Sequence, residues 1–307
     1  MTQATPDDPL ASPVEVPVAG GRLHVATTGP VEDRPLALCV HGITSSSRAW
    51  TLVAAHLDGA GVAVAAPDLR GRAASNGLPG PFGMAAHAAD LVAVLDHLGV
   101  DRAVVAGHSM GAYVVARLAA DHPDRVAGVV LVDGGLPLPR PAGLDGDVQA
   151  ALDAILGPAI ARLRQTFASE DEYVGFWRAH PAFAEPGAWG PAVEAYARYD
   201  LAGEPPALRS RVSEEAVRVD GAELLVDEAG QVAALRSLAG PVVLLRAPAG
   251  LLGSPPPFVP ADLADAAAAD VPALTVATVE GTNHYTLTLA EPGASAVADA
   301  IRGQVGA

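Results

Sequence analysis

The sequence predicts an α/β fold with a mostly parallel central sheet covered by helices on both faces. Two observations carry this prediction. Short runs such as residues 126–132 are apolar at every position, as strands buried on both faces are. These runs alternate with longer amphipathic stretches such as residues 84–99, whose apolar positions recur with the period of a helix. A third observation, a single break in this alternation, predicts an inserted helical cap.

The expected elements can be placed in order along the chain. The segments VEVPV and LHVATTG flank the turn AGGR and predict a β-hairpin near the N-terminus. Later apolar runs predict strands at residues 36–40, 62–66, 103–107, 126–132, 241–247 and 274–280. Helices are expected between the strands, including SRAWTLVAAHL and MAAHAADLVAVLDHLG, and Gly99 predicts the end of the latter.

The alternation breaks between Leu136 and about Leu235, where no strand pattern is visible. The segment opens with LPLPRPAG, a composition typical of linkers, and continues with helix-like stretches. It carries much of the aromatic content: Phe167, Tyr173, Phe176, Trp177, Phe183, Trp189, Tyr196 and Tyr199. We therefore predict a core domain of residues 1–136 and 236–307, with residues 137–235 as a helical cap (lid) domain.

Composition and charge exclude several classes of function. The chain has 307 residues, half of them hydrophobic, which is enough for a sizeable core. Its net charge of −16 gives no electrostatic reason to bind nucleic acid or an anionic membrane. The single cysteine, Cys39, lies in an apolar run and is interpreted as a buried strand residue. The N-terminus lacks signal-peptide features and no apolar run is long enough to span a membrane, so we expect a cytoplasmic protein.

A serine between two glycines is the first catalytic candidate. In VVAGHSMGAY (104–113), Ser109 follows an apolar run and precedes an amphipathic stretch. This G-x-S-x-G pattern is typical of a tight strand-to-helix turn, in which Gly107 and Gly111 leave space for close packing. A serine hydroxyl becomes a good nucleophile only beside a base. The alternative is a structural turn lined by glycines.

The segment CVHGITSSSRAW (39–50) is the second signal. A strand ends at His41 and Gly42, and the chain then turns toward a helix. Acyl transfer builds negative charge on a carbonyl oxygen, which two preorganised N–H groups can stabilise. The backbone N–H groups of Ile43 and Met110 are the candidates for this oxyanion hole. The alternative is an ordinary loop whose serines cap a helix, and the two roles are compatible.

His284 is the candidate base. It lies in EGTNHYTLT (280–288), after the last predicted strand, where a loop can reach back over the carboxyl edge of the sheet. His41 and His108 sit inside the two motifs and are interpreted as shaping neighbours, and His180 lies in the cap, where a structural role is favoured over substrate contact. Packing or surface positions are expected for the histidines in helical patterns: His56, His87, His97 and His122.

The HG loop, the GHSMG turn and the late NH pair together resemble the α/β-hydrolase fold family, in the same order along the chain. PDLRGRAASNG (67–77) also resembles the loop after the next strand of that family. The resemblance covers the whole chain, with the cap as the family's variable insertion. It implies a catalytic triad, an oxyanion hole and no metal or organic cofactor.

The triad acid departs from the commonest family pattern. Many members carry it just after the penultimate strand, but here PVVLLRA continues without a carboxylate until Asp262. The other family position is the tip of the strand after the nucleophile helix, where VAGVVLVDGG places Asp133. We predict Asp133 as the acid, with Asp262 or a loop-opening role of Asp133 as alternatives. Asp68 is expected to hold a structural loop with Arg70 or Arg72.

These features predict a serine hydrolase that cleaves a carboxylic ester or lactone of a small apolar substrate. Ser109 would be the nucleophile, His284 the base and Asp133 the residue that orients it. The cap aromatics expected to contact the substrate are Trp177, Tyr173, Tyr196 and Trp189.

Other functions share the same triad and stay open at this point. They are a C–C bond hydrolase, a thioesterase, an amidase and a cofactor-free haloperoxidase-like enzyme; a non-catalytic ligand-binding relative is a further alternative. Serine at position 109 argues against haloalkane dehalogenases and epoxide hydrolases, which by the resemblance use aspartate there. We expect a small-molecule partner and neither nucleic acid nor membrane. The sequence leaves the oligomeric state open, with a homodimer as one alternative.

Overall fold

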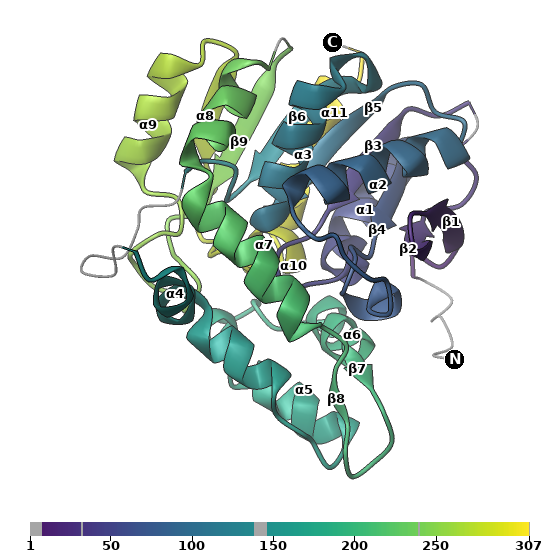
Figure 1. The fold of residues 1–307 in the computed structure, drawn as a ribbon, viewed down its shortest axis with the longest axis vertical. Helices are drawn as coiled ribbons and strands as arrows, with labels where there is room; N and C mark the ends of the chain where they lie inside the picture. Colours follow the sequence, from purple (N-terminus) through teal and green to yellow (C-terminus); the bar gives the residue numbers. More distant parts are fainter. Residues whose placement is uncertain (1–7, 32, 138–145, 239, 307) are drawn as a thin grey trace.

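The computed structural model describes residues 8–31, 33–137, 146–238 and 240–306 (Figure 1). Within these ranges the main sheet has eight strands in the order β1-β2-β4-β3-β5-β6-β9-β10. Their bounds are β1 Val14–Val18, β2 Gly21–Thr27, β3 Leu36–Val40, β4 Ala63–Pro67, β5 Ala103–His108, β6 Val126–Val132, β9 Val242–Arg246 and β10 Leu274–Thr278. β2 pairs antiparallel with β1 and β4, and the remaining neighbours are parallel. The predicted mostly parallel sheet is confirmed.

The central strands are buried because they are apolar on both faces. All residues of β3, β4 and β5 are buried. The apolar runs predicted these strands to within one or two residues at each end. Cys39 is one of these buried residues, and burial raises the pKa of its thiol.

Helices cover both faces of the sheet, as Figure 1 shows. On one face, α2 (Met84–His97) and α8 (Glu228–Arg236) pack against α3 (Met110–Asp121). On the other, α1 (Thr51–Gly59) packs against α11 (Gly293–Gln304). The other short elements are η1 Ser47–Trp50, η2 Ala73–Ser75, η3 Pro123–Arg125, η4 Pro181–Phe183, α9 Ala261–Asp270 and α10 Thr286–Leu289. Among the described residues, no helix combines the length and the apolar character needed to cross a membrane.

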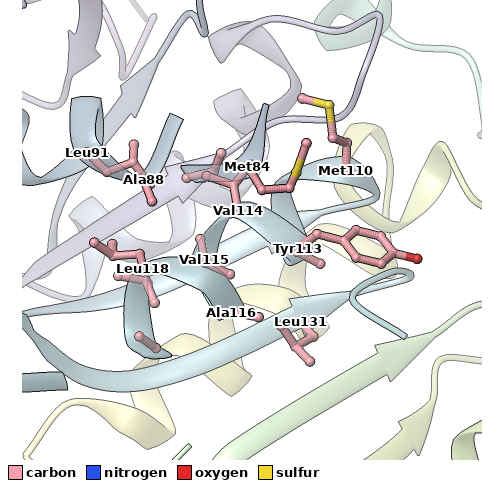
Figure 2. Close-up of a cluster of buried hydrophobic side chains, with 14 of the residues drawn as sticks. Met84, Ala88, Leu91, Met110, Tyr113, Val114, Val115, Ala116, Leu118 and Leu131 are labelled. Atoms are coloured by element: carbon pink, nitrogen blue, oxygen red, sulfur yellow. The ribbon is translucent and has the colours of Figure 1, made fainter. Parts of the chain in front are cut away.

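Apolar side chains of α2 and α3 form much of the core on the first face (Figure 2). Met84, Ala88 and Leu91 of α2 recur at helical spacing and belong to one buried cluster with Val114 and Leu118 of α3. Such close packing fixes α3 on the sheet. It thereby fixes the turn that immediately precedes α3, where the candidate nucleophile lies.

The segment between β6 and β9 is mainly helical, and we call its described residues 146–235 the cap segment. Its elements are α4 Val148–Leu163, α5 Glu170–Arg178, α6 Pro191–Tyr199, β7 Leu201–Ala202, β8 Arg209–Ser210, α7 Glu214–Val226 and most of α8. β7 and β8 form an antiparallel pair that the sequence did not predict, because two-residue strands show no alternation. The linker-like LPLPRPAG lies mostly outside the described residues.

Candidate active site

Ser109 lies in the turn between β5 and α3. Its backbone adopts φ 56° and ψ −121°, a conformation that residues with a side chain rarely adopt. Its N–H donates to the carbonyl of Val132 at 2.9 Å, and its own carbonyl accepts from the N–H of Ala112 at 3.0 Å. The strained turn is thus held by the neighbouring strand β6 and by the first turn of α3.

Gly107 and Gly111 allow this turn to pack closely. A Cβ atom on Gly107 would lie 2.1 Å from the carbonyl oxygen of Gly111. A Cβ atom on Gly111 would lie 2.1 Å from the carbonyl oxygen of Val40. Any side chain at either position would therefore force the helix away from the strands, which is the steric reason for the G-x-S-x-G pattern.

His284 and Asp133 form a buried pair at the carboxyl edge of the sheet. The Nδ1–H of His284 donates to Oδ2 of Asp133 at 2.8 Å, and Oδ1 accepts from the N–H of Ala247 at 3.1 Å. Asp133 is fully buried and His284 nearly so. Because the carboxylate holds the Nδ1 proton, the lone pair on Nε2 is the one left to accept a proton.

Asp133 reaches the place where the penultimate strand ends. Ala247, whose N–H binds the carboxylate, is the first residue after β9, and the N–H of Asp133 donates to the carbonyl of Leu245 in that strand at 2.7 Å. Asp262 lies exposed in the first turn of α9. The structure therefore brings Asp133, and not Asp262, to His284.

The loop that carries His284 is fixed by its neighbour Asn283. Oδ1 of Asn283 accepts from the N–H groups of Tyr285 and Thr286 at 3.0 and 3.1 Å. Its Nδ2 donates to the carbonyl of Ala182 in the cap segment at 2.8 Å. The position of the candidate base thus depends on contacts to its own loop and to the cap segment.

Two other buried histidines shape the site through the backbone. His108 donates from Nε2 to the carbonyl of His284 at 2.8 Å. His41 donates from Nδ1 to the carbonyl of Gly42 at 2.8 Å and accepts at Nε2 from the N–H of Leu69 at 3.0 Å. Burial lowers the pKa of His41 to about 4 and that of His108 well below its usual value, so both are neutral at pH 7.

Ser109 and His284 line the same cavity, which has a volume of about 510 Å³. Both predicted oxyanion residues, Ile43 and Met110, also line it. The ring of Phe258 lies 4.5 Å from that of His284 and closes one side. Most of the described wall is apolar, and the volume is typical of a site for one small molecule.

The four cap aromatics predicted to contact the substrate divide into two pairs. Trp177 and Tyr196 line the cavity, as expected for substrate-contacting residues. Tyr173 and Trp189 are not part of the wall formed by the described residues, so the structure does not support the substrate contacts predicted for them. The hydroxyl of Tyr173 is instead hydrogen bonded to Asp200 inside the cap segment. Aromatic composition singled out these helices but could not tell which face of each helix is turned to the cavity.

Several cavity residues were not singled out from the sequence. They come from α4, from the proline-rich loop after β9 and from the loop of the candidate base: Leu152, Ile155, Leu156, Leu251, Leu252 and Tyr285. His180, for which a structural role was favoured, lines the cavity as well. The apolar periodicity of α4 was a signal for a buried face, but not for the cavity that this face lines.

Asp68 holds a loop, although not through the arginines suggested by the sequence. It accepts from the N–H of Ser47 at 2.7 Å and from the hydroxyl of Tyr199 at 2.7 Å. Arg70 and Arg72 form ion pairs with other carboxylates, both of them distant in the sequence. Sequence proximity in DLRGR was therefore a poor guide to these partners.

Comparison with known proteins identifies the fold. A family model described as the alpha/beta hydrolase fold matches residues 35–156, which include the Ser109 turn and Asp133. The chain has the α/β-hydrolase fold. It is similar over nearly its whole length to the solved structure of E-2-(acetamidomethylene)succinate hydrolase. The TM-score is 0.77 and the identity 24%, over 96% of this chain and 99% of that one.

Two curated relatives come from Mycobacterium tuberculosis. Lipase LipV is 38% identical over 135 residues, which is 44% of this chain and 48% of that protein. Epoxide hydrolase B is 39% identical over 114 residues, 36% of this chain and 32% of that protein. The matched region therefore spans less than half the length of each relative.

Proposed function

We propose that this protein is a serine hydrolase that cleaves a carboxylic ester or lactone of a small apolar substrate. The observation that carries the proposal is the buried Asp133–His284 pair beside an apolar cavity that Ser109 also lines. A serine in a strained strand-to-helix turn, a neutral imidazole and a carboxylate that holds its proton are the parts that acyl transfer requires.

The first half of the proposed reaction forms an acyl-enzyme. Oγ of Ser109 attacks the substrate carbonyl carbon while Nε2 of His284 accepts the hydroxyl proton. Asp133, bound to Nδ1–H, stabilises the imidazolium that forms. The tetrahedral intermediate then collapses, the bond to the alcohol oxygen breaks, and the alcohol leaves with the proton from His284.

The second half releases the acid. His284 takes a proton from a water molecule, whose oxygen attacks the acyl carbon, and Ser109 regains its proton when the ester bond breaks. In both halves the negative oxygen would accept hydrogen bonds from the N–H groups of Ile43 and Met110. Met110 is the first residue of α3, so its N–H lies at the helix end that favours negative charge.

The residue at the nucleophile position bears on the similarity to epoxide hydrolase B. By the family resemblance, epoxide hydrolases use aspartate there, and this chain has Ser109. When a serine hydroxyl attacks a carbonyl carbon, the intermediate is an acyl ester of serine. A serine at this position therefore favours acyl transfer over epoxide opening. The apolar wall, with Trp177 and Tyr196 from the cap segment, favours an apolar acyl or alcohol group.

A substrate panel with two serine variants tests the proposal. We expect turnover of p-nitrophenyl esters of increasing chain length or of lactones, and loss of nearly all turnover in Ser109→Ala. Ser254→Ala is the matched control, because Ser254 also lines the cavity, and it should stay near the wild-type rate. A fluorophosphonate should label the wild type and the control but not Ser109→Ala. Activity above a few per cent in Ser109→Ala, or no labelling of the wild type, would contradict the proposal.

A further inference from the structure

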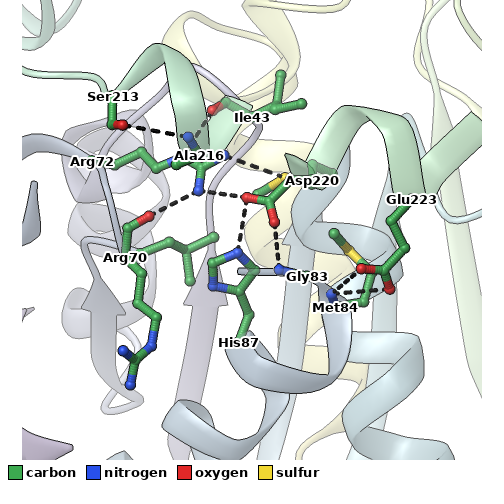
Figure 3. Close-up of polar contacts among 12 residues, drawn as sticks. Ile43, Arg70, Arg72, Gly83, Met84, His87, Ser213, Ala216, Asp220 and Glu223 are labelled. Atoms are coloured by element: carbon green, nitrogen blue, oxygen red, sulfur yellow. Dashed lines mark hydrogen bonds and ion pairs between the residues drawn. The ribbon is translucent and has the colours of Figure 1, made fainter. Parts of the chain in front are cut away.

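A buried arginine connects the cap segment to the loop of residues 42–45, which we call the oxyanion loop (Figure 3). Arg72 follows β4 and is fully buried. Its Nε–H donates to the carbonyl of Ile43 at 3.0 Å, and Nη1 donates to the carbonyl of Arg70 at 2.8 Å. Arg72 thus holds the main chain of the residue whose N–H is a proposed oxyanion donor.

The carboxylate partner of Arg72 comes from the cap segment. Oδ2 of Asp220, in α7, lies 2.5 Å from Nη1 of Arg72 and 3.0 Å from Nε2 of His87, and Oδ1 accepts from the N–H of Gly83 at 2.6 Å. Burial acts to raise the pKa of Asp220, but Arg72 and His87 outweigh it and the pKa is lowered. The carboxylate is therefore charged, and removing its charge would leave a buried guanidinium without its counter-ion.

The same turn of α7 also lies close to the side chain of Ile43. A Cβ atom on Gly221 would lie 3.3 Å from Cδ1 of Ile43 and 2.5 Å from Cδ1 of Leu152. A Cβ atom on Gly71, next to Arg72, would lie 2.5 Å from Cβ of Ala216 in α7. The helix therefore packs closely against both the side chain of Ile43 and the loop that carries Arg72.

A second buried arginine holds the next carbonyl of the oxyanion loop. Nη2 of Arg162, in α4, donates to the carbonyl of Thr44 at 3.3 Å. The guanidinium of Arg162 forms an ion pair with Asp200, which follows α6. Two consecutive carbonyls are thus bound by buried arginines, and both carboxylate partners lie in the cap segment.

The core restrains the peptide group that precedes Ile43. The carbonyl of Gly42 and the N–H of Ile43 belong to one peptide plane, and this carbonyl accepts from Nδ1 of His41 and from the N–H of Ser45. Arg72 binds the carbonyl in the following plane. Because both peptide planes are held, the direction of the Ile43 N–H is fixed. The restraint from Arg72 depends on the cap segment, because Arg72 is paired with Asp220.

We propose that the Asp220–Arg72 ion pair positions the oxyanion loop, so that the docking of α7 on the core sets the direction of the Ile43 N–H during acyl transfer. This inference rests on the proposed serine-hydrolase function. Arg72 is fully buried and does not line the described cavity, so it acts as a positioning residue and not on the substrate. An oxyanion donor that is displaced from the developing charge loses much of its effect on rate.

The same loop supplies a matched control. Arg70 binds Asp90 of α2 through Nε at 2.5 Å and through Nη2 at 2.7 Å, and both side chains are buried. Asp220→Asn and Asp90→Asn each remove the charge from a buried carboxylate paired with an arginine of this loop. Only the first pair includes an arginine that binds the oxyanion loop.

The first measurement is ester hydrolysis by folded protein. We expect Asp220→Asn to lower kcat by about 10-fold or more with a smaller change in KM, because no side chain that lines the described cavity is replaced. Asp90→Asn should lose stability without this loss of kcat. Equal kcat in the two variants would overturn the inference. If Asp220→Asn does not fold, Arg72→Lys replaces it, since lysine keeps the charge but not the fork that binds Asp220 and Ile43 together.

The second measurement does not depend on turnover. Amide hydrogen exchange of a peptide covering residues 41–46 should be faster in Asp220→Asn, or in Arg72→Lys, than in Asp90→Asn at matched stability. Unchanged exchange there would overturn the inference even if the protein is a serine hydrolase. Conversely, activity that survives in Ser109→Ala would overturn the proposed function, and the exchange comparison would still decide whether α7 controls the loop.

Discussion

The core wall and the cap wall of the cavity are held in place in different ways. On the core side, Ser109, Asp133 and His284 each follow the carboxyl end of a strand, and main-chain hydrogen bonds hold two of them. On the cap side, polar side chains make several of the links to the core, such as Asp220 with Arg72 and Tyr199 with Asp68, beside apolar packing.

This difference has consequences for how each wall can change. A main-chain contact persists whatever side chain occupies the position, whereas a side-chain contact disappears with a single substitution. The placement of Ser109 and Asp133 therefore depends mainly on the backbone, whereas the links of the cap wall through Asp220 and Tyr199 depend on specific side chains. Substitutions in the core wall should remove chemistry or folding, whereas those in the cap wall should change substrate preference or fine positioning.

The largest effect is expected from the carboxylate that orients His284. Asp133→Asn keeps the size of the side chain but favours the wrong imidazole tautomer, so we expect kcat for an ester to fall by about 10⁴-fold. This corresponds to roughly 5 kcal/mol of barrier. Asp262→Asn is the control, because Asp262 is exposed on α9, and it should be near silent. If Asp262→Asn loses its activity and Asp133→Asn keeps it, the triad acid was assigned wrongly.

The next largest effect is on stability, and it contrasts a closely packed glycine of the core with an exposed glycine of a cap helix. Gly111→Ala would place a Cβ atom 2.1 Å from the carbonyl oxygen of Val40, so we expect a loss of several kcal/mol in stability or no soluble protein. Gly175 is exposed within α5, and apart from the backbone of its own helix a Cβ atom there would have no described atom within 4 Å. Gly175→Ala should stabilise by up to about 1 kcal/mol. Urea unfolding of both variants checks this, and similar midpoints would contradict the contrast.

The contrast between the walls also explains what the sequence could predict. The strands around Ser109 were predictable because apolar runs and the G-x-S-x-G spacing reflect the backbone itself. Asp133 was predictable from its place after β6, because the carboxyl ends of parallel strands meet at one sheet edge. For these residues, sequence position nearly determines location in space.

The cap wall was predictable only in outline. Aromatic content singled out this segment, but Tyr173 and Trp177 are four residues apart on one helix, and only Trp177 lines the described cavity wall. The pairing of Arg72 with Asp220 joins residues far apart in the sequence, and no spacing rule predicts it. Tertiary packing decides such contacts, and the sequence pattern of one helix does not contain that information.

Buried neutral histidines on the core side predict a pH effect of intermediate size. The pKa of His41 is lowered to about 4 by burial, from 6.5 in the unfolded chain. Between these values the unfolded state binds more protons, so stability is full above pH 6.5 and falls as the pH drops toward 4. The contribution is at most about 3 kcal/mol. Urea unfolding from pH 7.5 to 4.5 should give a shallower slope for His41→Gln than for the wild type, and parallel slopes would refute the effect.

The smallest effect is expected on the cap side, in substrate preference. Trp177 lines the cavity and Trp189 does not line its described wall, so Trp177→Leu and Trp189→Leu form a matched pair within the cap segment. Removing part of an apolar wall weakens binding of the group that fills it, by about 10-fold in kcat/KM for a long-chain ester. A short activated ester, which does not reach that wall, should be hydrolysed at nearly the wild-type rate. Equal losses on both esters would indicate a folding defect, and the same preference shift in Trp189→Leu would mean that the cap segment acts through its overall packing and not through the residues that line the cavity.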